Sequence, residues 1–177
     1  MKRTFLFVLL FLGLFMLHSA TVWGDGYTAD MKVHRQNQLA RGVDAYVKGD
    51  YATALLEFKS LAERQHAKAQ FCLGWMYHRG KGVPKDYVKG LKWYKRAAEQ
   101  RHPTAQHMLG EMYSKGEGVP KDLVQAYKWY DLADRSDGGT VSAGTYRDFI
   151  KREMTRKEIE EAKELSRNCV KKEHKGC

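Results

Sequence analysis

Two pairs of side chains have the spacing of metal ligands in helical proteins. Glu63 with His66, and again Glu99 with His102, form a Glu-x-x-His pattern that recurs along the chain. In four-helix bundles this spacing places both ligands on one helix face, where they hold carboxylate-bridged metal centres. Such a centre also needs glutamates from facing helices, and no further glutamates converge here. We therefore interpret both pairs as structural, at the point where a helix ends and the chain turns.

The cysteines offer a second kind of chemistry. Cys169, His174 and Cys177 are of the side-chain types that bind zinc, but a structural zinc site normally has four ligands and no fourth is evident. Three cysteines in an oxidising compartment can also form one disulfide and leave one free thiol. Cys72 lies inside a helical pattern, so we expect it to be a small buried side chain with a free thiol.

Catalytic motifs are absent from the sequence. It contains neither Ser-x-x-Lys nor Lys-Thr-Gly, and neither His-Glu-x-x-His nor His-x-x-Glu-His. No serine belongs to a sequence motif that would supply it with a catalytic base. We expect no catalytic residue, no cofactor and no metal ion, and we look instead for a binding surface.

The composition fits one compact domain behind an export signal. The chain has 177 residues, of which 43% are hydrophobic, which suits one core. After Lys2 and Arg3, the apolar run 5–17 is too short to span a bilayer and leads into small or polar residues. Residues 1–24 therefore predict a signal peptide, cut after Gly24 or near Ala20, with an uncleaved anchor as the alternative. We expect a periplasmic or extracellular chain without a later membrane segment.

An internal repeat dominates the rest of the sequence. Sliding the chain by 36 residues aligns 67–98 with 103–134, and 17 of 32 positions are identical. A period of this length indicates stacked supersecondary units, here two helices each, which bury their apolar faces on one another. Gly80 and Gly116 are expected to end the first helices, and Asp86 and Asp122 to cap the second ones.

Glycine also recurs inside the first helices, as Gly74 and Gly110. Glycine costs about 1 kcal/mol against alanine inside a helix, so its recurrence predicts a neighbouring helix that packs too closely for a Cβ atom.

The repeat resembles a known family. The core AxAQxxLGxMYxxGxGVPKDxV, the KWY of the second helix and the 36-residue period are similar to Sel1-like repeats, relatives of the tetratricopeptide repeat. The resemblance is close over Ala67–Ala133 and loose over most of the mature chain. It implies an all-α fold, a right-handed α/α superhelical solenoid of about three helix-pair repeats with a C-terminal capping helix. It also implies a scaffold that assembles protein complexes, in bacteria often in the periplasm or outside the cell.

The resemblance divides the chain into units. A degenerate repeat at 33–66 has a shorter loop and looks closer to a tetratricopeptide repeat. It is followed by repeats at 67–102 and 103–138, and by capping helices and a tail at 139–177. Within this last part a short helix is expected near 146–152. A Thr155–Glu158 capping box then opens a helix through about Asn168.

Two further expectations come from relatives of this family. The Cys-x7-Cys spacing of Cys169 and Cys177 resembles the bridge between repeats in cysteine-rich Sel1-like proteins, which implies a disulfide that fastens the tail. Some cysteine-rich relatives have been described as penicillin-binding or β-lactamase-like, but the motifs of such activity are missing here.

The predicted binding surface is the concave side, which first helices line in stacked helix pairs. Its non-core positions include those at which the two repeats differ, and Phe71 and Trp75 are candidate anchors for a peptide or helix. Alternatively, these two aromatic residues only pack against adjacent units. The predicted surface consists of Gln70, Phe71, Trp75, His78, Gln106, His107, Glu111 and Ser114.

A basic stretch supplies an alternative function. The segment from Arg79 to Arg101 contains eight Lys and Arg residues and two acidic residues, which gives it a net charge of +6. Such a stretch could bind anionic cell-envelope material, whereas lysines spread along a helix often serve only solvation. Nucleic acid is not an expected partner, because of the export signal.

Overall fold

The computed structural model describes residues 30–136 and 141–177. The predicted signal peptide, residues 1–24, lies outside the described residues. The chain divides into two compact units, Met1–Ala40 and Arg41–Cys177. In the first unit, the described residues 30–40 are helical. Everything that follows concerns the second unit.

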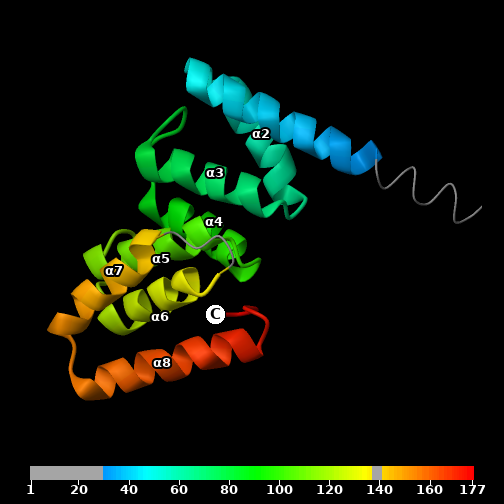
Figure 1. Cartoon of the computed structure of the whole chain (residues 1–177). Coiled ribbons are helices and arrows are strands. Elements are labelled where there is room, and N and C mark those ends of the chain that lie inside the picture. Colours follow the sequence, from blue (N-terminus) through cyan, green and yellow to red (C-terminus); the bar gives the residue numbers. More distant parts are fainter. Residues whose placement is uncertain (1–29, 137–140) are drawn as a thin grey trace, which may run out of the picture. The chain divides into compact units, whose positions relative to one another are not determined.

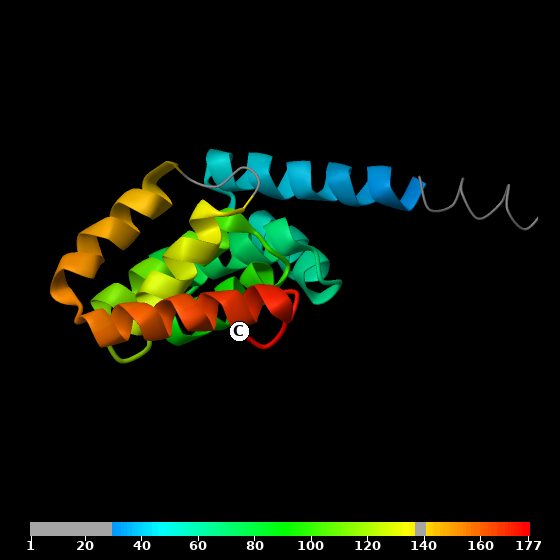
Figure 2. The same ribbon diagram turned by 60° about the horizontal axis from the view of Figure 1, so that its bottom comes forward.

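The second unit is built from consecutive helices (Figures 1 and 2). Each helix packs mainly against the next one in the chain, and the last one returns to pack on α6. The described residues form no strand, so the predicted all-α solenoid is confirmed. None of the described helices is long and apolar enough to cross a membrane. After helical residues 41–48, the elements are α2 (Tyr51–Glu63), α3 (Ala67–Arg79), α4 (Tyr87–Glu99), α5 (Pro103–Lys115), α6 (Leu123–Asp134), α7 (Val141–Ile150), a 3-10 turn (Lys151–Glu153) and α8 (Arg156–Lys171).

Glycine brings the two helices of each repeat into close contact. A Cβ atom on Gly74 would lie 2.7 Å from Cδ1 of Tyr94, and one on Gly110 would lie 2.6 Å from Cδ1 of Tyr130. Both tyrosine rings are fully buried. The prediction of a close approach at these glycines is therefore confirmed.

The turns between the helices follow the expected chemistry. Gly80 and Gly116 end α3 and α5 with φ angles of 66° and 75°, in the left-handed region that glycine favours. The carboxylate of Asp86 accepts a hydrogen bond from the amide of Lys89, which caps α4. Asp122 caps α6 in the same way. The two repeats thus share one turn geometry.

The recurring histidines cap helices. Nδ1 of His66 accepts from the amide of Ala69, and Nδ1 of His102 accepts from the amide of Ala105, both at 3.3 Å. The described part of the chain contains no group of three or more His, Cys, Asp and Glu side chains placed to hold a metal ion. Capping gives a structural reason for a histidine at the same place in each repeat.

The C-terminal helices extend further than predicted. The Thr155–Glu158 capping box opens α8, but the helix continues to Lys171 because Cys169 still packs in the core. The helix expected near 146–152 starts at Val141 and ends in the 3-10 turn. The helix packs on α6, which the local sequence does not reveal.

A disulfide joins Cys169 to Cys177, with 5.5 Å between their Cα atoms. It fastens the tail to α8, and Nζ of Lys128 on α6 donates to the Cys177 carbonyl oxygen at 2.8 Å. Lys128 is almost fully buried, and burial lowers the pKa of its amine to about 8. Cys72 keeps a free thiol, as expected, but it is half-buried rather than buried.

Candidate functional site

The predicted concave surface corresponds to the outward side chains of α3 and α5, which we call the α3–α5 face. Five of the eight predicted residues are partly exposed there, while Gln70, His78 and Gln106 are buried.

Gln70 and Gln106 are wrongly placed in the predicted surface. Their exposed fractions are 3% and 0%, because each amide points back into the turn between repeats. Nε2 of Gln70 donates to the Ala62 carbonyl at 3.1 Å, and Nε2 of Gln106 donates to the Ala98 carbonyl at 3.2 Å. The identity of this position in both repeats was the available sign of a packing role.

His78 is also buried, with an exposed fraction of 7%. Its Nε2 lies 3.0 Å from a carboxylate oxygen of Glu117 in the loop of the next repeat, and its Nδ1 lies 3.4 Å from the Tyr94 hydroxyl. Burial lowers the pKa of His78, and the nearby Glu117 opposes this effect. The side chain therefore links two repeats instead of contacting a partner.

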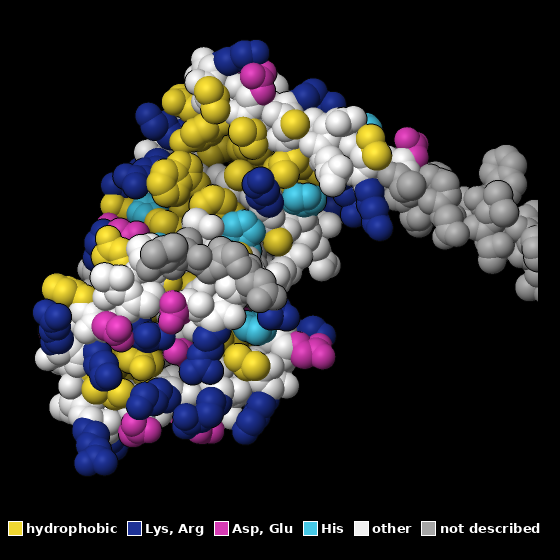
Figure 3. All heavy atoms as spheres, in the orientation of Figure 1, with side chains coloured by type: hydrophobic (Ala, Val, Ile, Leu, Met, Phe, Trp, Pro, Cys, Tyr) yellow, Lys and Arg dark blue, Asp and Glu magenta, His cyan; other side chains and the backbone are white. Residues whose placement is uncertain are grey.

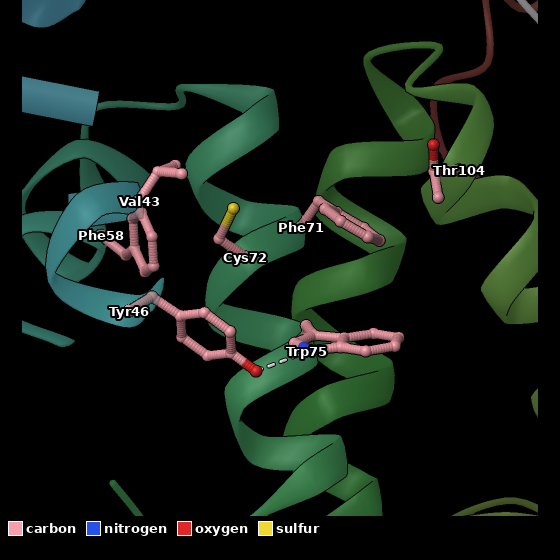
Figure 4. Close-up of a pocket in the computed structure, with 7 residues that line it drawn as sticks. All are labelled: Val43, Tyr46, Phe58, Phe71, Cys72, Trp75 and Thr104. Atoms are coloured by element: carbon pink, nitrogen blue, oxygen red, sulfur yellow. Dashed lines mark hydrogen bonds between the residues drawn. The ribbon is translucent and has the colours of Figure 1, made fainter. Parts of the chain in front are cut away.

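An apolar pocket opens on the α3–α5 face beside α3 (Figure 4). Its volume is about 350 Å³, and almost all of its lining is apolar. Figure 3 shows hydrophobic side chains gathered in a hollow over α3, with Lys and Arg side chains on both sides. The pocket is lined by Val43, Tyr46, Phe58, Phe71, Cys72, Trp75 and Thr104.

Only two of these lining residues, Phe71 and Trp75, were predicted. Val43, Phe58 and Thr104 come from three other helices, and no local pattern marks residues that only meet after stacking. The structure thus brings the two predicted anchors together and completes their pocket with residues that sequence reasoning missed.

Contacts behind the pocket hold its aromatic walls in place. Nε1 of Trp75 donates to the Tyr46 hydroxyl at 2.9 Å, so the indole N–H is already satisfied. The Arg79 guanidinium lies 4.5 Å from the centroid of the Trp75 ring. Phe71 stacks on His102, with 5.0 Å between ring centroids. The pocket is therefore preformed, and both aromatic rings remain partly exposed.

The Cys72 thiol in the pocket wall is poorly suited to nucleophilic chemistry. Burial raises its pKa to about 11, although the nearby Lys68 charge opposes this. A thiol with a raised pKa is protonated at neutral pH and reacts slowly. Cys72 therefore acts as an apolar surface.

The α5 part of the face is more polar. His107 is half-buried between the rings of Tyr130 and Tyr146, each 5.3 Å from its own, and burial lowers its pKa. Glu111 forms an ion pair with Lys115, and the Ser114 hydroxyl donates to the Glu111 carbonyl. Here α7 covers part of α5, so the open surface lies mainly beside α3.

Seven of the eight Lys and Arg side chains of the basic stretch are exposed, and Lys95 is half-buried. Several of its cations are occupied within the protein. Lys89 pairs with Asp86 at 3.2 Å, and Arg96 lies 4.5 Å from the centroid of the Trp93 ring. The stretch is a charged, exposed surface.

A second, polar pocket of about 510 Å³ lies at the ends of α2 and α4. Its lining includes both Glu63 and Glu99 together with Arg96 and Lys175, so it has no dominant charge. Nothing in it converges on one point as a catalytic or metal site would.

Comparison with known proteins identifies the repeat. The family described as Sel1 repeat matches residues 67–102 and 103–133. No curated protein matches the chain.

Two solved structures are similar to this chain. One is a protective antigen of uropathogenic Escherichia coli strains with an SLR fold, at 31% identity and a TM-score of 0.75, covering 79% of this chain and 30% of the other. The second is a Sel1 repeat protein from Oxalobacter formigenes, at 30% identity and a TM-score of 0.59, covering 65% of this chain and 46% of the other. The chain therefore spans less than half the length of either structure.

Proposed function

Because the chain is a Sel1-like repeat protein, we propose that it binds another protein on the α3–α5 face, with the apolar pocket as the anchor point. Sel1 repeats generally serve as protein–protein interaction scaffolds. The single observation that carries the choice of this face is the preformed pocket around Phe71 and Trp75. A pocket that needs no rearrangement to accept an apolar side chain binds it with little entropic cost.

The pocket also differs from an ordinary packing defect. Its walls include two partly exposed aromatic rings and Val43, which is itself 39% exposed. Aromatic residues in a desolvated hollow are the usual centre of a protein interface. Enzymatic activity has no comparable support, because no ionisable groups converge in this pocket.

We propose further that the chain acts outside the cytoplasm, in the periplasm or the extracellular space. The support is the basic and apolar pattern of residues 1–24 and the disulfide between Cys169 and Cys177. Disulfides persist in oxidising compartments.

Binding of anionic cell-envelope material through Arg79–Arg101 is the second candidate, supported by the exposure of seven of its eight cations. The two candidates differ in salt dependence. Binding by surface cations weakens steeply with ionic strength, whereas an apolar anchor does not.

Affinity capture tests the proposal. The immobilised full chain is incubated with envelope extract of the organism that makes it and washed at low salt and at about 0.5 M salt, where charges are screened within a few ångströms. The same capture is run with Val43→Gln, which places an amide in the pocket, and with Val47→Gln as the matched control. Val47 lies one turn later on the same helix, is 78% exposed and does not line the pocket.

The proposal expects a protein that remains bound at high salt, is retained by the Val47 variant and is lost from the Val43 variant. Retention of anionic material at low salt only would instead assign the function to the basic stretch. Equal retention by both variants would reject the pocket as the anchor.

A further inference from the structure

One line of side chains on α3 combines the pocket with two cations. Lys68, Cys72, Trp75 and Arg79 follow one another at spacings of four, three and four residues, which places them along one side of the helix. Cys72 and Trp75 line the pocket, and Phe71 lies beside them. The pocket therefore has a positive charge on its helix at either end.

We propose that the partner's binding segment is an acidic amphipathic helix, whose large apolar side chain fills the pocket and whose flanking carboxylates pair with Lys68 and Arg79. This inference rests on the proposed function, and it specifies the chemistry of the segment that the α3–α5 face accepts.

The walls of the pocket select an apolar side chain. The one indole N–H in the wall is already donated to Tyr46, and the remaining lining is almost wholly apolar. A polar side chain would lose its hydrogen bonds to water here without full replacement. An aromatic or branched aliphatic side chain gives up no hydrogen bonds to water on entering, and it covers the exposed parts of Phe71 and Trp75.

Both cations are exposed and available. Arg79 contacts the outer face of the Trp75 ring, and Lys68 lies near enough to lower the pKa of Cys72 and of His102. Among the described residues neither Lys68 nor Arg79 forms an ion pair.

The carboxylates on neighbouring elements already have partners. Glu57 pairs with Arg41 at 3.1 Å, Glu111 with Lys115, and Glu117 with His78. An acidic partner would thus meet two unpaired cations and few free carboxylates. This charge complementarity selects an acidic segment over a basic one.

The spacing favours a helix. Lys68 and Arg79 are 11 residues apart on α3, a rise of about 16 Å at 1.5 Å per residue. A partner helix of three turns covers the same distance. Its own side chains recur every three to four residues and can follow the line on α3, as in other helix-in-groove complexes.

Synthetic peptides test the inference directly. Two labelled helical peptides carry the same Leu and Phe stripe, flanked by Glu in one and by Lys in the other. We expect the full chain to bind the Glu peptide at least about tenfold more tightly in fluorescence anisotropy at low salt. The difference should shrink as salt is added, while binding through the apolar stripe persists.

Two sets of variants assign the binding to this site. Lys68→Glu/Arg79→Glu should reverse the preference, while Lys151→Glu/Lys171→Glu changes the charge equally at exposed positions far along the chain and should not. Val43→Gln should weaken binding of the Glu peptide about tenfold, and Val47→Gln should leave its affinity unchanged. Circular dichroism melts establish that each variant is folded.

Equal binding of both peptides, or a preference that the Lys68/Arg79 reversal leaves intact, would overturn the inference. So would no binding of either peptide. The proposed function fails separately, when envelope capture shows no difference between the Val43 and Val47 variants.

Discussion

Single side chains decide how closely the repeats pack. A Cβ atom on Gly74 would overlap the ring of Tyr94, which is fully buried and cannot move aside freely. We expect Gly74→Ala to lower the free energy of unfolding by about 1–2 kcal/mol, because overpacking outweighs the gain in helix propensity. Urea denaturation measures the change.

The same substitution in a Tyr94→Leu background identifies the cause. In that background the tyrosine ring is absent, so Gly74→Ala should lower the free energy of unfolding only slightly or even raise it. An equal cost in both backgrounds would mean that the Tyr94 contact is not the reason for glycine at this position.

Asp131 holds the last helices on the repeats. Its carboxylate is 5% exposed and accepts hydrogen bonds from Ser166 at 2.5 Å and from Arg147 at 3.2 Å, with Arg135 at 2.9 Å. Asp131→Asn should lower the free energy of unfolding by about 2–3 kcal/mol. This loss is smaller than that expected for a fully buried ion-pair network, because the arginines contact water. Asp44→Asn, at an exposed pair with Lys48, is the control and should change stability little. A similar effect of the two would contradict this role.

At the scale of helices, the His102 cap makes the stability of the fold sensitive to acid. Burial, and to a lesser extent the charge of Lys68, lowers the pKa of His102 from its ordinary 6.5. The folded state therefore binds its proton more weakly than the unfolded chain does. This part of the stability is complete above pH 6.5 and decreases as the pH falls toward the folded pKa.

His102→Asn tests the cap, because asparagine also caps helices but does not titrate. We expect similar stability to the native chain at pH 8 and a smaller loss of stability between pH 7 and pH 5, measured by urea denaturation. An unchanged pH dependence would contradict the assignment.

The disulfide acts on one element, the tail after α8. It closes a loop with a sequence separation of 8, for which loop entropy predicts a stabilisation of about 2–3 kcal/mol. Dithiothreitol should therefore lower the melting temperature of the native chain but not that of Cys169→Ser/Cys177→Ser. An equal shift in both would indicate that reduction acts elsewhere.

For the whole molecule, the repeat period made most of the architecture predictable. Gly80, Asp86 and their counterparts mark turns and caps by local rules that hold in every repeat. The pocket was predictable only at two of its seven lining residues. Phe71 and Trp75 stand where the repeats differ, but Val43 and Phe58 join them only through stacking. Their contacts depend on how units pack, which no local pattern encodes.

Among the polar residues of the predicted surface, too, some positions could be judged from the sequence and others only from the structure. Gln70 and Gln106 are identical in both repeats and proved to be buried, so identity between units marked packing rather than binding. His78 differs from its counterpart Ser114, yet it is buried, and its ring contacts the carboxylate of Glu117 in the following repeat. Only the stacked structure reveals that contact.

Photo-crosslinking directly tests whether a partner protein binds the α3–α5 face at its pocket. A photoreactive amino acid replaces Val43 in the native chain, in the cells that make it. The control carries it at Val170, an exposed apolar position on α8. Binding at the pocket should give a discrete protein adduct at position 43 that is absent at position 170. No adduct at 43, or the same adducts at both positions, would contradict it.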